Sequence, residues 1–210
     1  MVRAILADTG AKSQTRRTVK PQPETYQGES GVQFEWPGFH GSYSAEKFAA
    51  NCCPYGVAGD RLWVREAWCE LRKEHWHYSN KPKDWVVPGS QNHKNAAAYS
   101  ATVMPGSDND DIRKEYGYKW KPSIHMPRWA SRITLEVTST RIEPLHCITE
   151  ADAIAEGVDS VSMADVRRNG ALTRRCDFAQ LWEKINGKGS WETNPWVWVI
   201  GFKRLAVAAC

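Results

Sequence analysis

The sequence predicts one α+β domain with long inserted loops, and three patterns support that class. Residues 133–138 alternate apolar and polar side chains, which is typical of a half-buried strand. Residues 196–202 form a run rich in Trp and Val that indicates a buried strand. Within residues 178–185 the apolar side chains recur at i, i+3, i+4 and i+7, the spacing of one helical face. Because no internal repeat or linker separates these patterns, we expect a single core.

The first part of the chain predicts short elements joined by long connections. Apolar residues within 2–6 predict a helix that ends at Gly10. Residues 13–19 are polar and favour a strand or an extended loop. Residues 21–58 hold four prolines and five glycines without a sustained period, so we expect mostly loop there.

The middle of the chain predicts two strands separated by a long excursion. The turn signal Gly59-Asp60 precedes a strand over residues 62–68. Residues 70–95 are rich in Lys, His, Asn and Pro, which favours an excursion before a short strand at 96–101. Residues 105–111 predict a polar, acidic turn.

Two helices in the last third have recognisable ends. Thr149 and Asp152 stand at the spacing of a capping box, which predicts a helix through residues 153–156. The amphipathic segment 178–185 is followed by Asn186-Gly187, a typical helix stop. Both helices are therefore expected to end close to these signals.

Charge and hydropathy limit the class of protein. The 28 basic and 24 acidic residues give a net charge of +4, which permits an anionic partner without requiring one. No apolar run reaches the roughly 18 residues of a membrane span, and the first eight residues become acidic too early for a signal peptide. We therefore expect a cytoplasmic protein with no membrane partner, and its six scattered cysteines as reduced thiols.

The segment from Gly10 to Arg17 carries the first chemical signal. It brings an amine, two hydroxyls and two guanidinium groups into eight residues. Lys12 acts as a general base only where burial or a neighbouring cation lowers its pKa, and the Thr15 hydroxyl needs such a base to attack a carbonyl. Taken alone, the segment also fits the solvated basic edge of a strand.

The pattern Gly10-x-Lys12-x-x-Thr15-x-Arg17 resembles the G-x-K-x-x-[ET]-x-R signature of the ASCH family, small barrels similar to the PUA domains of RNA-modifying proteins. Two more blocks fit that family in order: the Gly59-Asp60 turn with its strand, and residues 145–156, which resemble the family's leucine–threonine–glutamate helix. Further segments resemble the longer ASCH-like proteins of bacteriophages and prophages; they lie at 53–56, 63–66, 125–129 and 196–198.

This resemblance implies an α+β fold of the PUA-like (ASCH) type, a mixed β-barrel with flanking helices. The barrel would be closed by strands that begin near residues 13, 62, 96, 133 and 196. One domain would span residues 1–210, with insertions at about 22–50, 70–118 and 157–172.

One bacterial branch of the family is an amidohydrolase that removes the acetyl group from N(4)-acetylcytidine. The resemblance places its catalytic Lys, Thr and Glu on Lys12, Thr15 and Glu156. In the implied mechanism Lys12 deprotonates Thr15, the Thr15 oxygen attacks the acetyl carbonyl, and Glu156 assists the departing amine and the water that clears the acyl group.

Five residues are expected to bind substrate: Arg17, Arg65, Glu66, His125 and Arg128. The arginines would stabilise an oxyanion or hold a phosphate. The stretch that carries His125 and Arg128 equally fits a connection fixed by prolines. We expect no metal and no cofactor, because no Cys pair has zinc-ligand spacing and the acidic turn at 105–111 lacks the glycine and glutamate of a calcium loop.

Three functions remain open at this point. The first is the amidohydrolase, whose partner is a modified nucleoside or RNA, with no obligatory protein partner. The second is a non-catalytic module that binds RNA or a modified base through the same pocket. The third is a ribonuclease, since Lys, Thr and Glu also assist phosphodiester cleavage.

Overall fold

The computed structural model describes residues 5, 12–28, 31–36, 41–72, 95–103, 105–106, 108–158 and 173–205. Their contacts divide them into two compact units. The first contains the described residues among 3–61 and 136–203, and the second contains those among 62–135 together with 204 and 205. This division does not test the single domain expected over residues 1–210, which stays a prediction.

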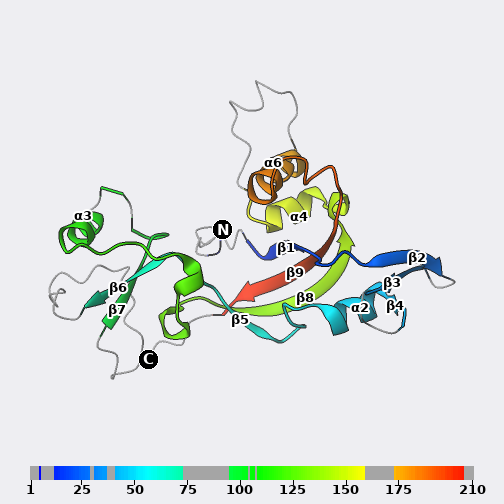
Figure 1. Ribbon diagram of the computed structural model, residues 1–210, viewed down its shortest axis with the longest axis horizontal. Helices are drawn as coiled ribbons and strands as arrows, with labels where there is room; N and C mark the ends of the chain where they lie inside the picture. Colours follow the sequence, from blue (N-terminus) through cyan, green and yellow to red (C-terminus); the bar gives the residue numbers. More distant parts are fainter. Residues whose placement is uncertain are drawn as a thin grey trace. The chain divides into compact units, whose positions relative to one another are not determined.

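A curled antiparallel sheet forms a half-barrel, so the predicted α+β class is confirmed (Figure 1). Its strands follow the order β1-β9-β8-β5. Their bounds are β1 Gln14–Thr18, β9 Trp196–Arg204, β8 Thr134–Pro144 and β5 Arg61–Trp63. β1 pairs with β9 in an antiparallel register that sets Thr15 opposite Ile200 and Arg16 opposite Val199. The alternating and apolar patterns thus correctly predicted β8 and β9.

Two helices cover one face of this sheet in the first unit. They are α4, Glu150–Ala155, and α6, Arg174–Asn186. Their buried residues form one core with alternate residues of β9 and with the short helix η5, Leu145–Cys147; the core comprises Leu145, Ile148, Ala153, Phe178, Trp182, Val197 and Val199. Because Val197 and Val199 alternate along β9, this face of the strand is the one that meets the helices.

The predicted helix ends are confirmed. Thr149 caps α4 in a complete capping box, since its hydroxyl accepts from the Asp152 backbone N–H while the Asp152 carboxylate accepts from the Thr149 backbone N–H. α6 begins after Thr173, earlier than the apolar spacing predicts, and ends before Gly187, whose φ of 102° favours glycine.

The opposite face of the sheet is covered by aromatic rings. Trp198 stacks on Phe48 with ring centroids 5.5 Å apart and on Trp36 at 6.1 Å, and Phe34 stacks on Phe48 at 5.2 Å. Phe48 belongs to α2, Ala45–Cys52, which lies on the side of the sheet away from α4 and α6 (Figure 1). Most of β9 is therefore buried on both faces.

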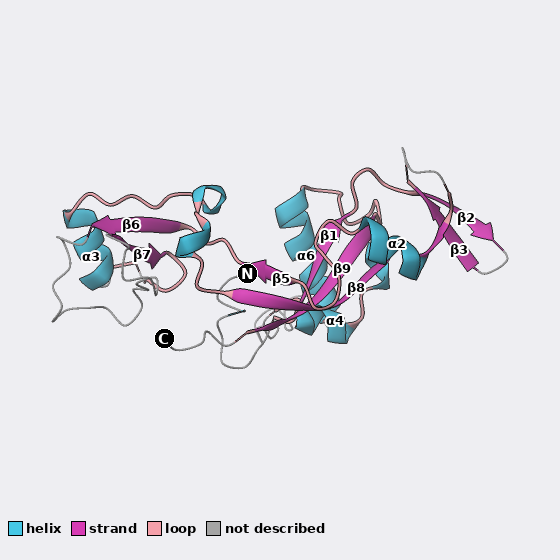
Figure 2. Ribbon diagram, turned by 90° about the horizontal axis from the view of Figure 1, so that it is seen from below, coloured by secondary structure: helices cyan, strands magenta, loops and turns pink. Residues whose placement is uncertain are grey.

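The loop expected over residues 21–58 is wrong for much of its length. A three-stranded sheet of order β2-β3-β4 lies beside α2 (Figure 2), with bounds Glu24–Gly28, Gly31–Glu35 and Tyr43–Ser44. Within these strands Phe34 is buried, whereas β2 is exposed almost throughout. Because this sheet buries so little surface, its strands do not need alternating apolar and polar residues, and the sequence shows no strand pattern there.

The second unit contains a two-stranded sheet, β6 Trp68–Arg72 with β7 Asn95–Tyr99. The strand expected at 96–101 therefore pairs with β6, and its expected place in the five-stranded barrel is wrong. Trp68, Ala97, Tyr99, Met126 and Ala130 form the core, and the last two come from beside or within the short helices η3, Ser123–His125, and η4, Arg128–Ala130.

Of the acidic turn expected at 105–111, residues 105 and 106 do form a turn, whereas residues 108–111 begin a helix, α3, Asp108–Glu115. Asp110 stabilises the start of α3. Its carboxylate accepts hydrogen bonds from the Gly106 backbone N–H and from Arg113, and it forms an ion pair with Lys114. Local ion pairs therefore help to stabilise this helix.

Several expectations lie outside the described residues: the helix within 2–6 apart from Ile5, the stop at Gly10, most of the excursion at 70–95 and most of the insertion at 157–172. Within the part that is described, no helix has both the length and the apolarity of a membrane crossing. The five cysteines described there are free thiols.

Candidate functional site

The backbone joins the start of β1 to the end of α4. Lys12 and Glu156 form an antiparallel bridge although 144 residues separate them. The Ser13 N–H donates to the Ala155 carbonyl at 2.8 Å, and the Ser13 carbonyl accepts from the Phe202 N–H at 2.8 Å. Backbone hydrogen bonds alone therefore bring residues 12 and 156 next to each other.

Lys12 and Glu156 form a buried ion pair. The Lys12 Nζ donates to the Glu156 Oε2 at 2.9 Å and to the Glu156 backbone carbonyl at 2.6 Å. The two side chains are 6% and 5% exposed. Burial lowers the pKa of Lys12 below its ordinary value of 10.5; the charge of Glu156 opposes that shift, and the charges of Arg17 and Arg16 add to it. Burial thus shifts the pKa of Lys12 in the direction that a lysine base requires.

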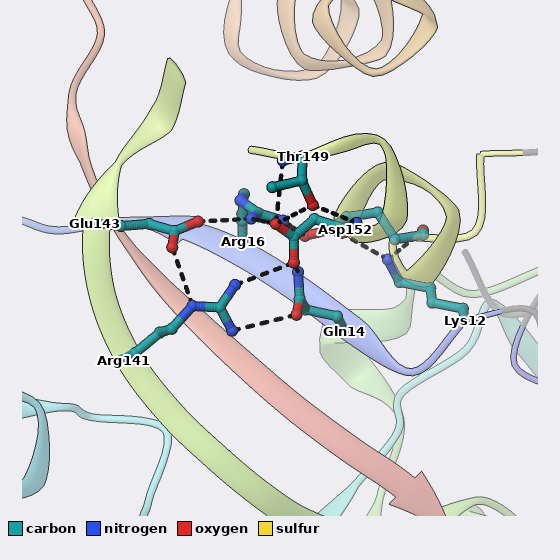
Figure 3. A network of polar contacts seen from close by, with 8 residues as sticks. Lys12, Gln14, Arg16, Arg141, Glu143, Thr149 and Asp152 are labelled. Carbon is teal, nitrogen blue, oxygen red and sulfur yellow. Dashed lines mark hydrogen bonds and ion pairs between the residues drawn. The ribbon is translucent and has the colours of Figure 1, made fainter. Parts of the chain in front are cut away.

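Arg16 is the centre of a larger buried network (Figure 3). Its guanidinium contacts three carboxylates: Glu143 at 2.6 Å, Glu156 at 3.2 Å and Asp152 at 3.3 Å. The Arg16 side chain is fully buried, and the Glu156 side chain is nearly so. Because one cation faces three anions, the remaining negative charge is compensated by Lys12 and by the partners at the rim of the network.

Those rim partners hold Asp152. The Gln14 amide donates to the Asp152 Oδ1 at 3.0 Å, and Arg141 donates to the same oxygen at 3.1 Å and to Glu143 at 3.0 Å. Burial alone would raise the pKa of Asp152, but the hydrogen bonds from Gln14 and Thr149 and the charge of Arg16 lower it overall. Asp152 therefore joins the helix cap to the buried network.

A pocket of about 180 Å³ opens against this network in the first unit. One part of its wall is polar and the other is apolar and comes from α6; the lining residues are Lys12, Thr15, Arg16, Arg17, Thr18, Glu156, Gly157, Phe178, Leu181, Trp182, Ile185 and Asn186. Leu181 and Ile185 are 39% and 68% exposed, so large apolar side chains remain at the surface beside the pocket. Such a pairing of a polar end with an apolar wall is typical of a small-molecule site.

Thr15 and Arg17 line the pocket from the face of β1 opposite to the one that carries Arg16. Residues directly opposite each other in an antiparallel pair share one face, so Arg16 shares its face with Val199, which meets the helices. Thr15 lies opposite Ile200, on the face that alternates with it. The structure therefore joins Lys12 to Glu156 directly and brings Thr15 into the same pocket wall from the alternate face of the strand.

The other expected binding residues lie in the second unit. Arg65 and Arg128 are exposed and share one aromatic ring, with guanidinium carbons 4.7 Å and 5.7 Å from the centroid of Trp63. In the described part of the chain neither arginine has a carboxylate partner. His125 is also exposed. Arg65 and Arg128 thus form a small cationic site around an indole ring.

Glu66 has a structural contact instead of an open position. It is 2% exposed and accepts two hydrogen bonds from Arg132, at 2.9 and 2.8 Å. The Arg132 guanidinium lies 4.0 Å above the ring of Tyr99, and burial raises the pKa of that tyrosine. The arrangement satisfies Glu66 and orders the core of the second unit.

The sequence reasoning missed Arg16, Glu143 and the apolar wall from α6. Lys12, Gln14 and Arg16 recur at every second position, which in a strand places all three side chains on one face. Such an alternation of long polar residues is the signal that would have indicated a buried polar network. It was missed because polar alternation usually marks the solvent face of a strand.

Comparison with models of protein families, with curated proteins and with solved structures gave no match. Within the described ranges, no group of three or more His, Cys, Asp or Glu side chains is arranged to hold a metal ion.

Proposed function

We propose that the chain is an amidohydrolase that removes the acyl group from N(4)-acetylcytidine or a related modified nucleoside, free or in RNA, on a PUA-like (ASCH) fold. The observation that carries the proposal is the buried contact of 2.9 Å between Lys12 and Glu156 in the wall of a pocket. A desolvated lysine beside a carboxylate supplies a base and an acid at one point.

The dimensions and polarity of the pocket support a base-sized ligand. Its volume of about 180 Å³ lies below the ~300–1,000 Å³ of most small-molecule pockets, so it suits one ring with a short substituent. Phe178 and Trp182 supply an apolar surface for a planar ring, and Lys12 and Glu156 lie where an amide substituent would meet polar groups.

The proposed reaction has two steps. First, the Lys12 ammonium of the ion pair passes a proton to Glu156, and neutral Lys12 then accepts the proton of Thr15 as the Thr15 Oγ1 bonds to the acyl carbon. The C–N bond breaks as the Lys12 ammonium returns that proton to the departing amine, and Glu156 gives its own proton back to Lys12. Second, Glu156 accepts a proton from water as the water oxygen bonds to the acyl carbon, and that proton passes to the Thr15 oxygen as the ester breaks. Cytidine and acetate are the products, and Lys12, Thr15 and Glu156 regain their starting states.

A second candidate is a non-catalytic module that binds RNA or a modified base. The register of β1 favours it, because Thr15 lies opposite Ile200 while Lys12 contacts Glu156 from the alternate face. The exposed Arg65 and Arg128 over Trp63 suit a polyanion as well.

The test is a chromatographic assay for cytidine and acetate after incubation with N(4)-acetylcytidine and with acetylated RNA. Lys12→Met and Thr15→Val are expected to lower kcat by about 10²-fold or more. Lys47→Met and Thr25→Val, at exposed positions of α2 and β2, serve as matched controls and should retain activity. Thermal melting of each variant shows whether it is folded.

Two outcomes overturn the proposal in different ways. If the wild type releases no acetate from either substrate but binds RNA, the binding module is the correct function. If Thr15→Val retains full activity while Lys12→Met loses it, Thr15 is not the nucleophile and a water activated by Lys12 and Glu156 takes its place.

A further inference from the structure

The pocket beside the Lys12–Glu156 pair lies against the free edge of β1. This strand is the last one at its end of the four-stranded order, so in the described part of the chain one of its two edges has no neighbouring strand. Four consecutive residues of β1, Thr15 to Thr18, line the pocket. Consecutive side chains of a strand point to opposite faces, so a pocket that contacts all four residues adjoins the edge that the two faces share.

Arg16 contributes its main chain to the pocket wall. Its side chain is 0% exposed, whereas the residue as a whole is 5% exposed, so the exposed atoms belong to the main chain. The guanidinium is held among the three carboxylates of the network. Arg16 nevertheless lines the pocket, and it therefore presents main-chain atoms there.

The register with β9 gives the direction of these main-chain groups. The Ser13 carbonyl and the Val19 N–H, on either side of β1, each form a main-chain hydrogen bond with β9, at 2.8 and 3.0 Å. In an antiparallel pair, hydrogen-bonded residues alternate with residues that do not bond to the partner strand, so the odd-numbered residues of β1 are the ones that bond to β9. The N–H and C=O groups of Arg16 and Thr18 therefore point away from β9, to the free edge.

Two of these groups form an adjacent acceptor and donor. The Arg16 carbonyl and the Thr18 N–H are neighbours along the same edge, and within the described ranges neither has a hydrogen-bond partner. Main-chain groups that a ligand removes from water require such partners. A ligand that satisfies both groups at once carries an N–H donor beside an acceptor atom, as a peptide or an aminopyrimidine does.

The dimensions of the pocket favour a single ring over an extended peptide, because its volume is about 180 Å³ and α6 supplies an apolar wall. We propose that the free edge of β1 recognises the amino side of a cytosine ring. The Arg16 carbonyl accepts from the exocyclic N4–H, and the Thr18 N–H donates to the ring N3. In this order N4 lies toward the end of β1 where Lys12 and Glu156 meet. The inference rests on the pocket used in the proposed function, but it concerns recognition by the main chain rather than the reaction.

The test compares cytidine with 3-deazacytidine, in which a C–H group replaces N3, by calorimetric titration at pH 8. Both nucleosides are uncharged at that pH, so the exposed Arg17 in the pocket wall acts alike on the two. We expect the wild type to bind cytidine about tenfold more tightly. Thr18→Pro removes the N–H in question and should abolish the preference; proline is tolerated in an edge strand where the N–H faces away from the sheet. Thr18→Ala, which keeps the N–H, is the matched control and should still prefer cytidine.

A second measurement uses the unaltered protein and does not depend on the folding of Thr18→Pro. Hydrogen exchange followed by NMR should find the Thr18 amide exchanging faster than the Arg17 amide, which pairs with β9. Cytidine should slow exchange at Thr18 and leave Arg17 unchanged.

The inference is wrong if the wild type binds neither nucleoside or binds both alike, if a folded Thr18→Pro keeps the preference, if Thr18→Ala loses it, or if cytidine leaves the exchange rate of Thr18 unchanged. Failure of the proposed function is recognised separately. A protein that binds cytidine at Thr18 and releases no acetate overturns the amidohydrolase alone, whereas acetate release without a response at Thr18 overturns this inference alone.

Discussion

Replacing Arg16 with Met should strongly destabilise the first unit. The substitution keeps the length and much of the apolar volume of the side chain but removes the guanidinium that contacts Glu143, Asp152 and Glu156 within 3.3 Å. The Arg16 side chain is fully buried, so water cannot replace it. Removing one partner of a buried ion pair costs about 3–5 kcal/mol, because the other charge stays buried without compensation. Lys12 still compensates Glu156 in this variant, so we expect the free energy of unfolding to decrease by an amount within that range.

Arg141→Met provides a matched control in the same network. Arg141 contacts Asp152 and Glu143 at 3.1 and 3.0 Å, close to the distances that Arg16 makes, but its side chain is 42% exposed. An exposed ion pair contributes about 0–1 kcal/mol, so this variant should lose less than about 1 kcal/mol. Urea unfolding of wild type and both variants, followed by far-ultraviolet circular dichroism, measures the difference.

The pH dependence of the same experiment separates charge from packing. The folded-state pKa of Asp152 lies below its ordinary value of 3.8, so the unfolded state binds the proton more readily, and the wild type should lose stability as the pH falls below about 4. Arg16→Met should lose less over that range, because the carboxylates are then easier to protonate in the folded state. A loss below 1 kcal/mol at pH 7, or equal acid sensitivity in both proteins, would refute the reasoning.

Three further predictions concern single groups. In ¹³C NMR, the pKa of the Lys12 amine should lie below 10.5 and should fall further in Glu156→Gln, since Glu156 opposes the effect of burial; a value at or above 10.5 would contradict this. Stability should accordingly rise with pH between the lowered value and 10.5, because the unfolded chain holds that proton more tightly. Thr149→Ala should cost about 0.5–2 kcal/mol in urea unfolding and Thr149→Ser much less, and equal losses would show that the cap is unimportant. Burial raises the pKa of Cys69 to about 11, so mass spectrometry after iodoacetamide at pH 8 should find the exposed Cys147 labelled and Cys69 unmodified until the protein is unfolded; native labelling of Cys69 would refute its burial.

Local signals in the sequence predicted local structure well. The capping box of Thr149 and Asp152 depends on residues three positions apart, and the stop at Gly187 depends on one backbone conformation. Strands β8 and β9 were predictable because each buries a periodic or continuous set of apolar side chains. In all these cases the determining interactions, or the pattern of burial, are visible within a short window of sequence.

Features that depend on distant partners were not predictable in this way. The Arg16 network joins β1 to residues more than 120 positions away, and nothing in the polar stretch around Arg16 distinguishes burial among carboxylates from exposure to water. The pairing of β7 with β6 instead of with the four-stranded sheet is likewise a tertiary choice. For the candidate site, the pairing of Lys12 with Glu156 was expected from the resemblance to a known family and not from the residues themselves. The side of β1 from which Thr15 enters the pocket required the register with β9.

The pairing of β1 with β9 has a consequence for folding during synthesis. β1 stands at one end of the four-stranded order and pairs with β9, so Arg16 meets Val199 only after almost the whole chain has been synthesised. At roughly 5–20 residues per second, that interval lasts about 10–40 s on the ribosome. An apolar strand left unpaired for so long would invite aggregation, whereas Gln14, Arg16 and Arg17 keep this strand hydrated while it waits. Gln14 and Arg16, which later belong to the buried network, therefore also protect the nascent chain.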